Sequence, residues 1–384
     1  MNVEIRALAE RLGARGIAVD IFTRCAGRAR PEVEVVGSLA RVVQVPAGPC
    51  AEVDKVDLPA LVPDFAESLV RRATELGPYD LVHAHYWLSG PAGIAAARRW
   101  GVPLIASFHT LAEVKNLAGA GAGVPEPLAR VAGERRAIDA ADRVLAPTRQ
   151  DAHALIELYG ADPERVRVVP PGVDRAIYFA RDSGEARSRL GLGEGPVVLF
   201  VGRLQDLKGP DLAIRAFAQV RREATLLIVG GPSGAEGGSI LKRLERLAAD
   251  QGVLDRLRFA PPVPHEELSW VYSAADMLLM PSRSESFGLA ALEAQACGVP
   301  VVASRVGGLR TAVRHGASGY LVEGRDPRAY ASRILELIDS PQLAARLARG
   351  AVGHAARFPW DATVDRLVGA YAELLPVLEA AAAS

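Results

Sequence analysis

Cysteine, long apolar runs and net charge are all scarce in this sequence, and each shortage excludes a class of protein. The 3 cysteines, Cys25, Cys50 and Cys297, are odd in number and widely spaced, and they show no metal-ligand pattern. We therefore expect a reducing, cytoplasmic setting. No apolar stretch approaches the length of a membrane span, so we expect no integral membrane segment.

The charge balance argues against a broad polyanion-binding surface. The chain has 45 basic and 45 acidic residues, which gives a formal net charge of zero. Neither nucleic acid nor an anionic membrane is therefore an expected partner, and any phosphate site must be local. A length of 384 residues with 49% hydrophobic and 23% charged residues is typical of a soluble protein with about two domains.

Short β-branched segments alternate with helical ones, a pattern typical of parallel α/β sheets. In the first half the predicted strands are residues 17–22, 42–45, 79–83, 103–107, 143–146 and 166–169. In the second half they are residues 197–201, 225–229, 257–260, 277–280, 300–303 and 320–322. The two sets predict two doubly wound domains.

The predicted domains are residues 1–173 and 196–359. A Pro/Gly-rich segment that begins at Pro170 separates them and is a natural hinge. The last segment, residues 360–384, is helical by its apolar spacing and has no strand after it. We expect this helix to pack back onto the first domain.

Two charged loops follow predicted strands of the second half. Arg203 and Lys208 come directly after strand 197–201, and Glu285 and Glu293 surround Gly288, which opens a helix. Because parallel strands end at one edge of a sheet, both loops are expected to face one crevice. Such charges singly are most often solvated, but together Arg/Lys pairs suit phosphate oxygens and carboxylates suit sugar hydroxyls. The pattern predicts a site for a phosphorylated sugar nucleotide.

Several segments carry a resemblance to a known family. The two charged loops and the turn Gly230-Gly231-Pro232-Ser233-Gly234 resemble the donor site of family 4 glycosyltransferases of the GT-B fold. Four more segments resemble the D-inositol-3-phosphate glycosyltransferases of mycothiol synthesis and, more distantly, the sucrose-phosphate synthases; they are residues 1–3, 47–49, 83–90 and 109–116. The resemblance implies two Rossmann-like domains that face each other across a cleft, and a retaining hexosyltransferase.

The resemblance also implies the donor contacts. Arg203 and Lys208 match the pair that grips the donor pyrophosphate and balances charge on the departing UDP. Glu285 matches the carboxylate on the donor sugar, and Glu293 matches the one on the ribose. The remaining expected donor-binding residues include Phe287, with Gly288 and Leu289 contributing backbone N–H groups. Val263 is expected near the uracil, at a position where the mycothiol enzymes carry a basic residue; the difference matters little where the contact is through backbone atoms.

On the acceptor side, four residues match the positions that hold the phosphate of inositol phosphate. They are Lys55, Tyr86, Thr110 and Arg130. Two cations and two hydroxyls can satisfy a dianionic phosphate. Asn2 matches a contact to the acceptor ring.

His109 matches an active-site histidine near the transferred sugar. Without the resemblance, a histidine at a strand end is more often a structural residue whose hydrogen bonds are made within the protein. We include His109 with Arg203, Lys208 and Glu285 among the expected catalytic residues.

No catalytic cofactor is expected, although the resemblance is compatible with a structural magnesium held by carbonyls near Tyr272, Ser273 and Ala275. The expected partners are a UDP-sugar, with N-acetylglucosamine as the predicted sugar, and a phosphorylated polyol, with inositol phosphate as the predicted acceptor. A homodimer is compatible with the resemblance. Two alternatives stay open: a sucrose-phosphate synthase-like or other family 4 hexosyltransferase, and a non-catalytic protein that binds sugar phosphates.

The first residues differ from the start of a doubly wound domain. Residues 2–12 have the apolar spacing of an amphipathic helix, whereas such a domain starts with a central strand and a glycine turn. In the family, the residue that matches Met1 follows a glycine pair. We therefore expect about twenty further residues of strand and loop before Met1 in a longer form, and a gap in the first sheet without them.

Overall fold

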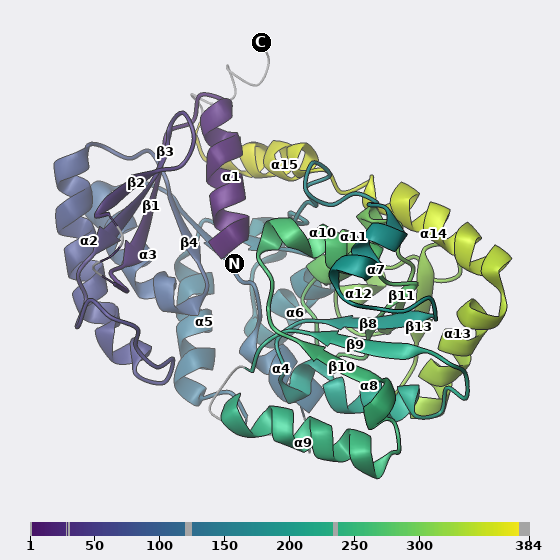
Figure 1. Ribbon diagram of the computed structural model, residues 1–384. Helices are drawn as coiled ribbons and strands as arrows, with labels where there is room; N and C mark the ends of the chain where they lie inside the picture. Colours follow the sequence, from purple (N-terminus) through teal and green to yellow (C-terminus); the bar gives the residue numbers. More distant parts are fainter. Residues whose placement is uncertain (1, 28, 30, 120–124, 233–236, 376–384) are drawn as a thin grey trace. The chain divides into compact units, whose positions relative to one another are not determined.

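The computed structural model describes residues 2–27, 29, 31–119, 125–232 and 237–375 (Figure 1). It divides into two compact units. Unit 1 comprises Met1–Pro171 and Trp360–Ser384, and unit 2 comprises Gly172–Pro359. Among the described residues, no helix combines the length and the apolar character needed to cross a membrane.

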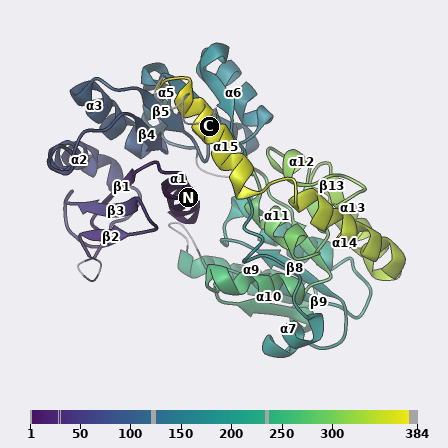
Figure 2. The same ribbon diagram turned by 90° about the horizontal axis from the view of Figure 1, so that it is seen from above.

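Unit 1 contains two separate sheets (Figure 2). The first is parallel, in the order β4 (Val82–His85), β5 (Leu104–Ser107), β6 (Arg143–Ala146) and β7 (Val166–Val168). In the second, β3 (Ala40–Val45) pairs in parallel with β1 (Val19–Arg24) and antiparallel with β2 (Val33–Val35). Within the described chain, β1 and β4 each pair with one strand. A strand before Met1 stays a prediction. The three-residue strand β2 was not predicted.

The helices of unit 1 cover its sheets. They are α1 (Asn2–Ala14), α2 (Val62–Leu76), α3 (Gly90–Trp100), α4 (Ala112–Gly119), α5 (Leu128–Ala140), α6 (Arg149–Tyr159) and α15 (Trp360–Ala372). Short 3₁₀ turns lie at η1 (Leu58–Leu61), η2 (Trp87–Ser89) and η3 (Pro163–Arg165).

One apolar cluster of unit 1 joins the two ends of the chain. Leu8 and Leu12 of α1 pack with Val364 and Leu367 of α15 on buried Ile105 of the parallel sheet. The Thr363 hydroxyl also donates a hydrogen bond to the Pro170 carbonyl at 2.8 Å. The C-terminal helix is thereby part of unit 1.

Unit 2 is built on a six-stranded parallel sheet. Its order is β10 (Leu257–Ala260), β9 (Thr225–Val229), β8 (Val197–Val201), β11 (Met277–Met280), β12 (Val301–Ser304) and β13 (Gly319–Val322). Two buried apolar clusters lie on the two faces of this sheet. Successive strands run outward in opposite directions from β8 and β11, so the boundary between these two strands is the topological switch point.

The helices of unit 2 are α7 (Ser183–Arg189), α8 (Pro210–Phe217), α9 (Gly237–Asp250), α10 (Leu268–Ser273), α11 (Leu289–Ala296), α12 (Leu309–Ala312), α13 (Pro327–Asp339) and α14 (Pro341–Ala355). Its 3₁₀ turns are η4 (Asp206–Lys208), η5 (Leu254–Arg256) and η6 (His265–Glu267). The segment before α7 belongs to unit 2, where Tyr178 is buried.

Cys25 and Cys50 form a disulfide, with Cα atoms 4.9 Å apart. Cysteine spacing alone did not predict this pair. It arises because β1 and β3 are parallel neighbours that end together, so Cys25, just after β1, lies beside the segment that follows β3. The Cys25 amide donates to the Val45 carbonyl at 2.9 Å. Cys297 is buried and free. A cytoplasmic setting stays a prediction.

Candidate active site

The two charged loops of unit 2 leave adjacent strands. The loop after β8 carries Lys208, and the loop after β11 carries Glu285. The Lys208 ammonium and the Glu285 carboxylate form an ion pair, and both side chains are mostly shielded from solvent. The predicted shared edge is therefore present, and it lies at the switch point of the sheet, where open α/β sheets bind ligands.

Arg203 lies on the same loop as Lys208 and is exposed. In the described chain its guanidinium has no hydrogen bond or ion pair. The loop itself is fixed, because the Leu204 amide donates to the Gly231 carbonyl at 2.9 Å. Gly230 has φ +155°, and a Cβ there would collide with the Gly202 carbonyl. This close approach joins the Arg203 loop to the predicted glycine turn, of which Ser233 and Gly234 lie outside the described residues.

The Glu285 loop ends at Gly288, which has φ +94° and caps α11. Phe287 is buried beside it, and Leu289 begins the helix. The first N–H groups of a helix have no partner within it, so this end can bind an anion.

A second glycine loop, which sequence reasoning missed, supports Glu285. The Gly308 amide donates to the Glu285 carbonyl at 2.8 Å, and a Cβ at Gly308 would collide with the Ser286 backbone. The available signal was the glycine pair Gly307-Gly308 after strand β12. This pair lets the two loops pack against each other.

Glu293 lies one turn into α11 and points toward α10. The Tyr272 hydroxyl donates to its carboxylate at 2.7 Å. Burial raises the pKa of Glu293, although the Tyr272 hydrogen bond and the nearby His265 act in the opposite direction. Val263 packs against the apolar cluster of unit 2 that contains Tyr272. The structure thus adds a phenol partner that sequence reasoning missed.

At the predicted magnesium site near Tyr272, Ser273 and Ala275, one backbone carbonyl and one side-chain hydroxyl already have partners. The Tyr272 carbonyl accepts the Ala275 amide at 3.0 Å, and the Ser273 hydroxyl accepts the Arg181 amide at 2.9 Å. Over the described ranges, no three His, Cys, Asp or Glu side chains are grouped so that they could hold a metal ion. Magnesium stays a prediction.

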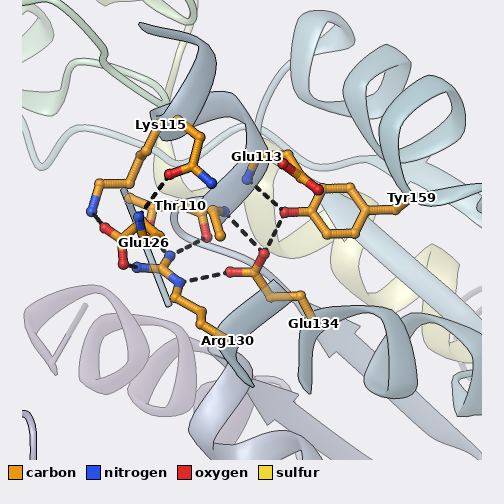
Figure 3. Close-up of polar contacts among 9 residues, drawn as sticks. Thr110, Glu113, Lys115, Glu126, Arg130, Glu134 and Tyr159 are labelled. Atoms are coloured by element: carbon orange, nitrogen blue, oxygen red, sulfur yellow. Dashed lines mark hydrogen bonds and ion pairs between the residues drawn. The ribbon is translucent and has the colours of Figure 1, made fainter. Parts of the chain in front are cut away.

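Unit 1 brings together three of the residues predicted for the acceptor phosphate, and Figure 3 shows two of them, Arg130 and Thr110. Arg130, on α5, is 4% exposed, and its Nη2 donates to the Thr110 hydroxyl at 2.8 Å and to the Thr110 carbonyl at 3.1 Å. Its guanidinium also lies over the Tyr86 ring, 5.2 Å from the centroid. Lys55 is exposed in the turn before η1, and no hydrogen bond or ion pair joins it to the rest of the described chain.

Two carboxylates that were not predicted surround Arg130. Its Nε donates to Glu134 at 2.9 Å and its Nη1 donates to Glu126 at 2.9 Å. Burial acts to lower the pKa of Arg130, but Tyr86 and these carboxylates raise it overall. The guanidinium is therefore charged, and each of its three nitrogens donates at least one hydrogen bond. The spacing of Glu126, Arg130 and Glu134, each four residues apart, was the available signal.

His109 lies at the centre of a chain of polar side chains. Its Nδ1 is 3.3 Å from the Glu4 carboxylate of α1, and its Nε2 is 3.3 Å from His85 Nδ1. Burial lowers the pKa of His83 to about 3, and burial together with His83 and His109 lowers that of His85 well below its usual value. His109 is therefore held by a carboxylate and a neutral imidazole. Asn2 begins α1, and its side chain lies outside the described part.

Comparisons with known proteins identify the family. A glycosyl transferase 4-like domain matches residues 1–172, and a glycosyl transferases group 1 domain matches residues 182–353. The D-inositol 3-phosphate glycosyltransferase of Acidothermus cellulolyticus is 51% identical over 98% of this chain and 86% of its own length. That of Thermomonospora curvata is 47% identical over 100% of this chain and 92% of its own length. The chain belongs to this glycosyltransferase family.

Solved structures agree with this family and give the glycosyltransferase its fold class. A sucrose-phosphate synthase from Thermosynechococcus elongatus has a TM-score of 0.90 and 30% identity, and the match covers 98% of this chain and 94% of that one. Anabaena HepE, solved with UDP and glucose, has a TM-score of 0.78 at 23% identity, over 97% of this chain and 96% of its own. The predicted GT-B fold and the predicted enzyme class are confirmed. The roles of individual residues in this glycosyltransferase stay predictions.

Proposed function

We propose that this glycosyltransferase moves N-acetylglucosamine from a UDP-sugar to a hydroxyl of inositol phosphate, with retention of configuration. The observation that carries the proposal is the contact of Arg130 with Thr110 and Tyr86, which gathers a guanidinium, the Thr110 hydroxyl and the Tyr86 ring in one place. A dianionic phosphate suits such a set. The relatives named D-inositol 3-phosphate glycosyltransferase, at 46–51% identity, support the same acceptor.

The donor roles follow from the charges of unit 2. Arg203 and Lys208 supply positive charge to the diphosphate, on which negative charge grows as the sugar departs. The Glu285 carboxylate forms an ion pair with Lys208 before the donor binds, and it accepts hydrogen bonds from hydroxyls of the sugar. The Glu293 carboxylate, which the Tyr272 hydroxyl holds by a hydrogen bond, accepts hydrogen bonds from the ribose hydroxyls.

The transfer needs no protein nucleophile. The bond from the anomeric carbon to the diphosphate oxygen breaks, and the acceptor hydroxyl forms its new bond on the same face. The hydroxyl proton passes to the departing diphosphate oxygen. We assign His109, held by Glu4 and His85, to the developing positive charge on the sugar, because it matches the active-site histidine of the family.

A UDP-release assay with a panel of acceptors tests the proposal. Turnover is expected with inositol phosphate and UDP-N-acetylglucosamine, and free inositol is expected to be a far poorer acceptor. Thr110→Val, which removes one hydroxyl, should raise the acceptor KM and leave donor binding unchanged. Arg98→Ala, on an exposed part of α3, is the matched control. Equal activity on inositol and inositol phosphate contradicts the proposal, and NMR of the product tests retention.

A second candidate is a transferase that acts on a hexose phosphate. It is favoured by the TM-score of 0.90 to the sucrose-phosphate synthase. The same panel separates the two functions, since preferential turnover of a hexose phosphate, with UDP-glucose as donor, would replace inositol phosphate as the acceptor.

A further inference from the structure

The two carboxylates that hold Arg130 differ in how firmly they are bound (Figure 3). Glu134 is 0% exposed, and it accepts hydrogen bonds from the Ala112 amide at 2.9 Å and from the Tyr159 hydroxyl as well as from Arg130 Nε. Removal of any of these contacts leaves a buried charge with too few partners. Glu134 is therefore a fixed part of unit 1.

Glu126 is more accessible and is held mainly by cations. Its side chain is 21% exposed. One carboxylate oxygen accepts Arg130 Nη1 at 2.9 Å, and the other forms an ion pair with the ammonium of Lys115 on α4. Burial acts to raise the pKa of Glu126, but Lys115 and Arg130 lower it overall. Glu126 is thus an anion whose two carboxylate oxygens each form an ion pair with a different cation.

The local charge is balanced by this arrangement. Arg130 and Lys115 carry two positive charges, and Glu126 and Glu134 carry two negative ones. If Glu126 moved away, the Nη1 of Arg130 and the Lys115 ammonium would both lack a partner, next to the Thr110 hydroxyl and the Tyr86 ring. A phosphate presents several oxygens in the same way as the two oxygens of a carboxylate, and its second charge strengthens its attraction to the cations.

We propose that Glu126 occupies the place of the acceptor phosphate on Arg130 and Lys115, that a phosphate displaces it, and that Lys115 is a further phosphate-binding residue. This inference rests on the proposed function and adds a specificity device to it. A neutral polyol has no charge with which to displace Glu126, so the residue excludes unphosphorylated acceptors. The displacement weakens the apparent affinity for phosphate, as does any equilibrium that favours a closed state.

The backbone of Glu126 explains how the residue can hold this position. Its amide donates to the Asn116 side-chain carbonyl at 2.7 Å, and Pro127 caps α5 directly after it. Asn116 neighbours Lys115 on α4. The anchor is therefore independent of the carboxylate, so the side chain can leave its cations while the backbone stays in place.

Calorimetric titration with inorganic phosphate and with inositol phosphate tests the inference. Glu126→Gln should bind both about tenfold more tightly than the unaltered chain, because the competing charge is gone. Lys115→Met should weaken binding about tenfold, because one cation is lost. Glu75→Gln, which alters an exposed carboxylate paired with Arg72, is the matched control, and UDP binding should not change in any variant.

A purely structural role for Glu126 predicts the opposite result. Unchanged or weaker phosphate binding by Glu126→Gln overturns the inference. If that variant melts at a lower temperature, Glu126→Asp serves instead; it keeps the charge but is too short to reach both cations, and it should also bind phosphate more tightly.

The inference and the proposed function fail in different ways. Tighter phosphate binding by Glu126→Gln without turnover of inositol phosphate supports the inference and removes inositol phosphate as the acceptor. Turnover of inositol phosphate with the same KM in the variant and the unaltered chain supports the function and overturns the inference.

Discussion

The Lys208 ammonium contacts the Glu285 carboxylate across the loops that follow β8 and β11. The two residues are distant in the sequence and meet because their strands are neighbours at the switch point of the unit 2 sheet. In the proposed function, a cation held by a carboxylate in this way is positioned before the donor binds, so that little reorganisation is needed when charge develops on the diphosphate.

Lys208→Ala is expected to lower turnover by more than it weakens UDP-sugar binding. The loss should be on the order of 2 to 4 kcal/mol in transition-state terms, because a preorganised charge is removed. Steady-state kinetics and calorimetric donor titration measure the two effects separately. Lys242→Ala, exposed on α9, is the control. Near-normal turnover of Lys208→Ala would show that Lys208 has another role.

Arg130→Ala is expected to impair both acceptor binding and folding. It leaves the buried carboxylate of Glu134 without its charged partner, and breaking a buried ion pair typically costs about 3 to 5 kcal/mol. Chemical denaturation measures the stability, and Thr110→Val, which keeps the ion pair, separates the acceptor effect from it. A fully stable Arg130→Ala variant is incompatible with the Glu134 contact.

Donor binding is expected to strengthen as pH rises through the raised pKa of Glu293. Only the ionised carboxylate can accept hydrogen bonds from two hydroxyls, and burial favours its protonated form. The Tyr272 hydrogen bond acts against burial, so Tyr272→Phe should move the inflection to higher pH. UDP affinity measured from pH 4 to 8 reports this shift, with Tyr320→Phe as the control. If the inflection lies at the same pH in Tyr272→Phe, Tyr272 is not the residue that lowers the pKa of Glu293.

Thiol titration is expected to detect the pairing of Cys25 and Cys50. The denatured, unreduced chain should show one thiol, that of Cys297, and reduction should release two more. Because the bridge closes a loop with a separation of 25 residues, its loss should lower the stability of unit 1 by about 2 to 4 kcal/mol. Three thiols in the unreduced chain would instead support the reducing setting expected from the sequence.

The strands and the donor motif were predictable from the sequence because they depend on local patterns. Apolar runs such as 197–201 and 277–280 are buried on both faces, and they form β8 and β11 with the predicted bounds. Glycine at 288 was informative because the helix start there requires a positive φ. Both patterns extend over only a few residues, so they can be recognised without knowledge of the rest of the chain.

The partners of charged side chains required the tertiary structure. Glu126 and Glu134 reach Arg130 through the local spacing of four residues. Lys115 joins Glu126 only because α4 packs against α5. The disulfide likewise depends on the parallel pairing of β1 with β3. The sequence by itself determined the two α/β units and the residue types at the strand ends, because these follow from local periodicity and turn chemistry. Which charges from distant segments meet was decided by tertiary packing, since such side chains become partners only when those segments bring them within about 3 Å of each other.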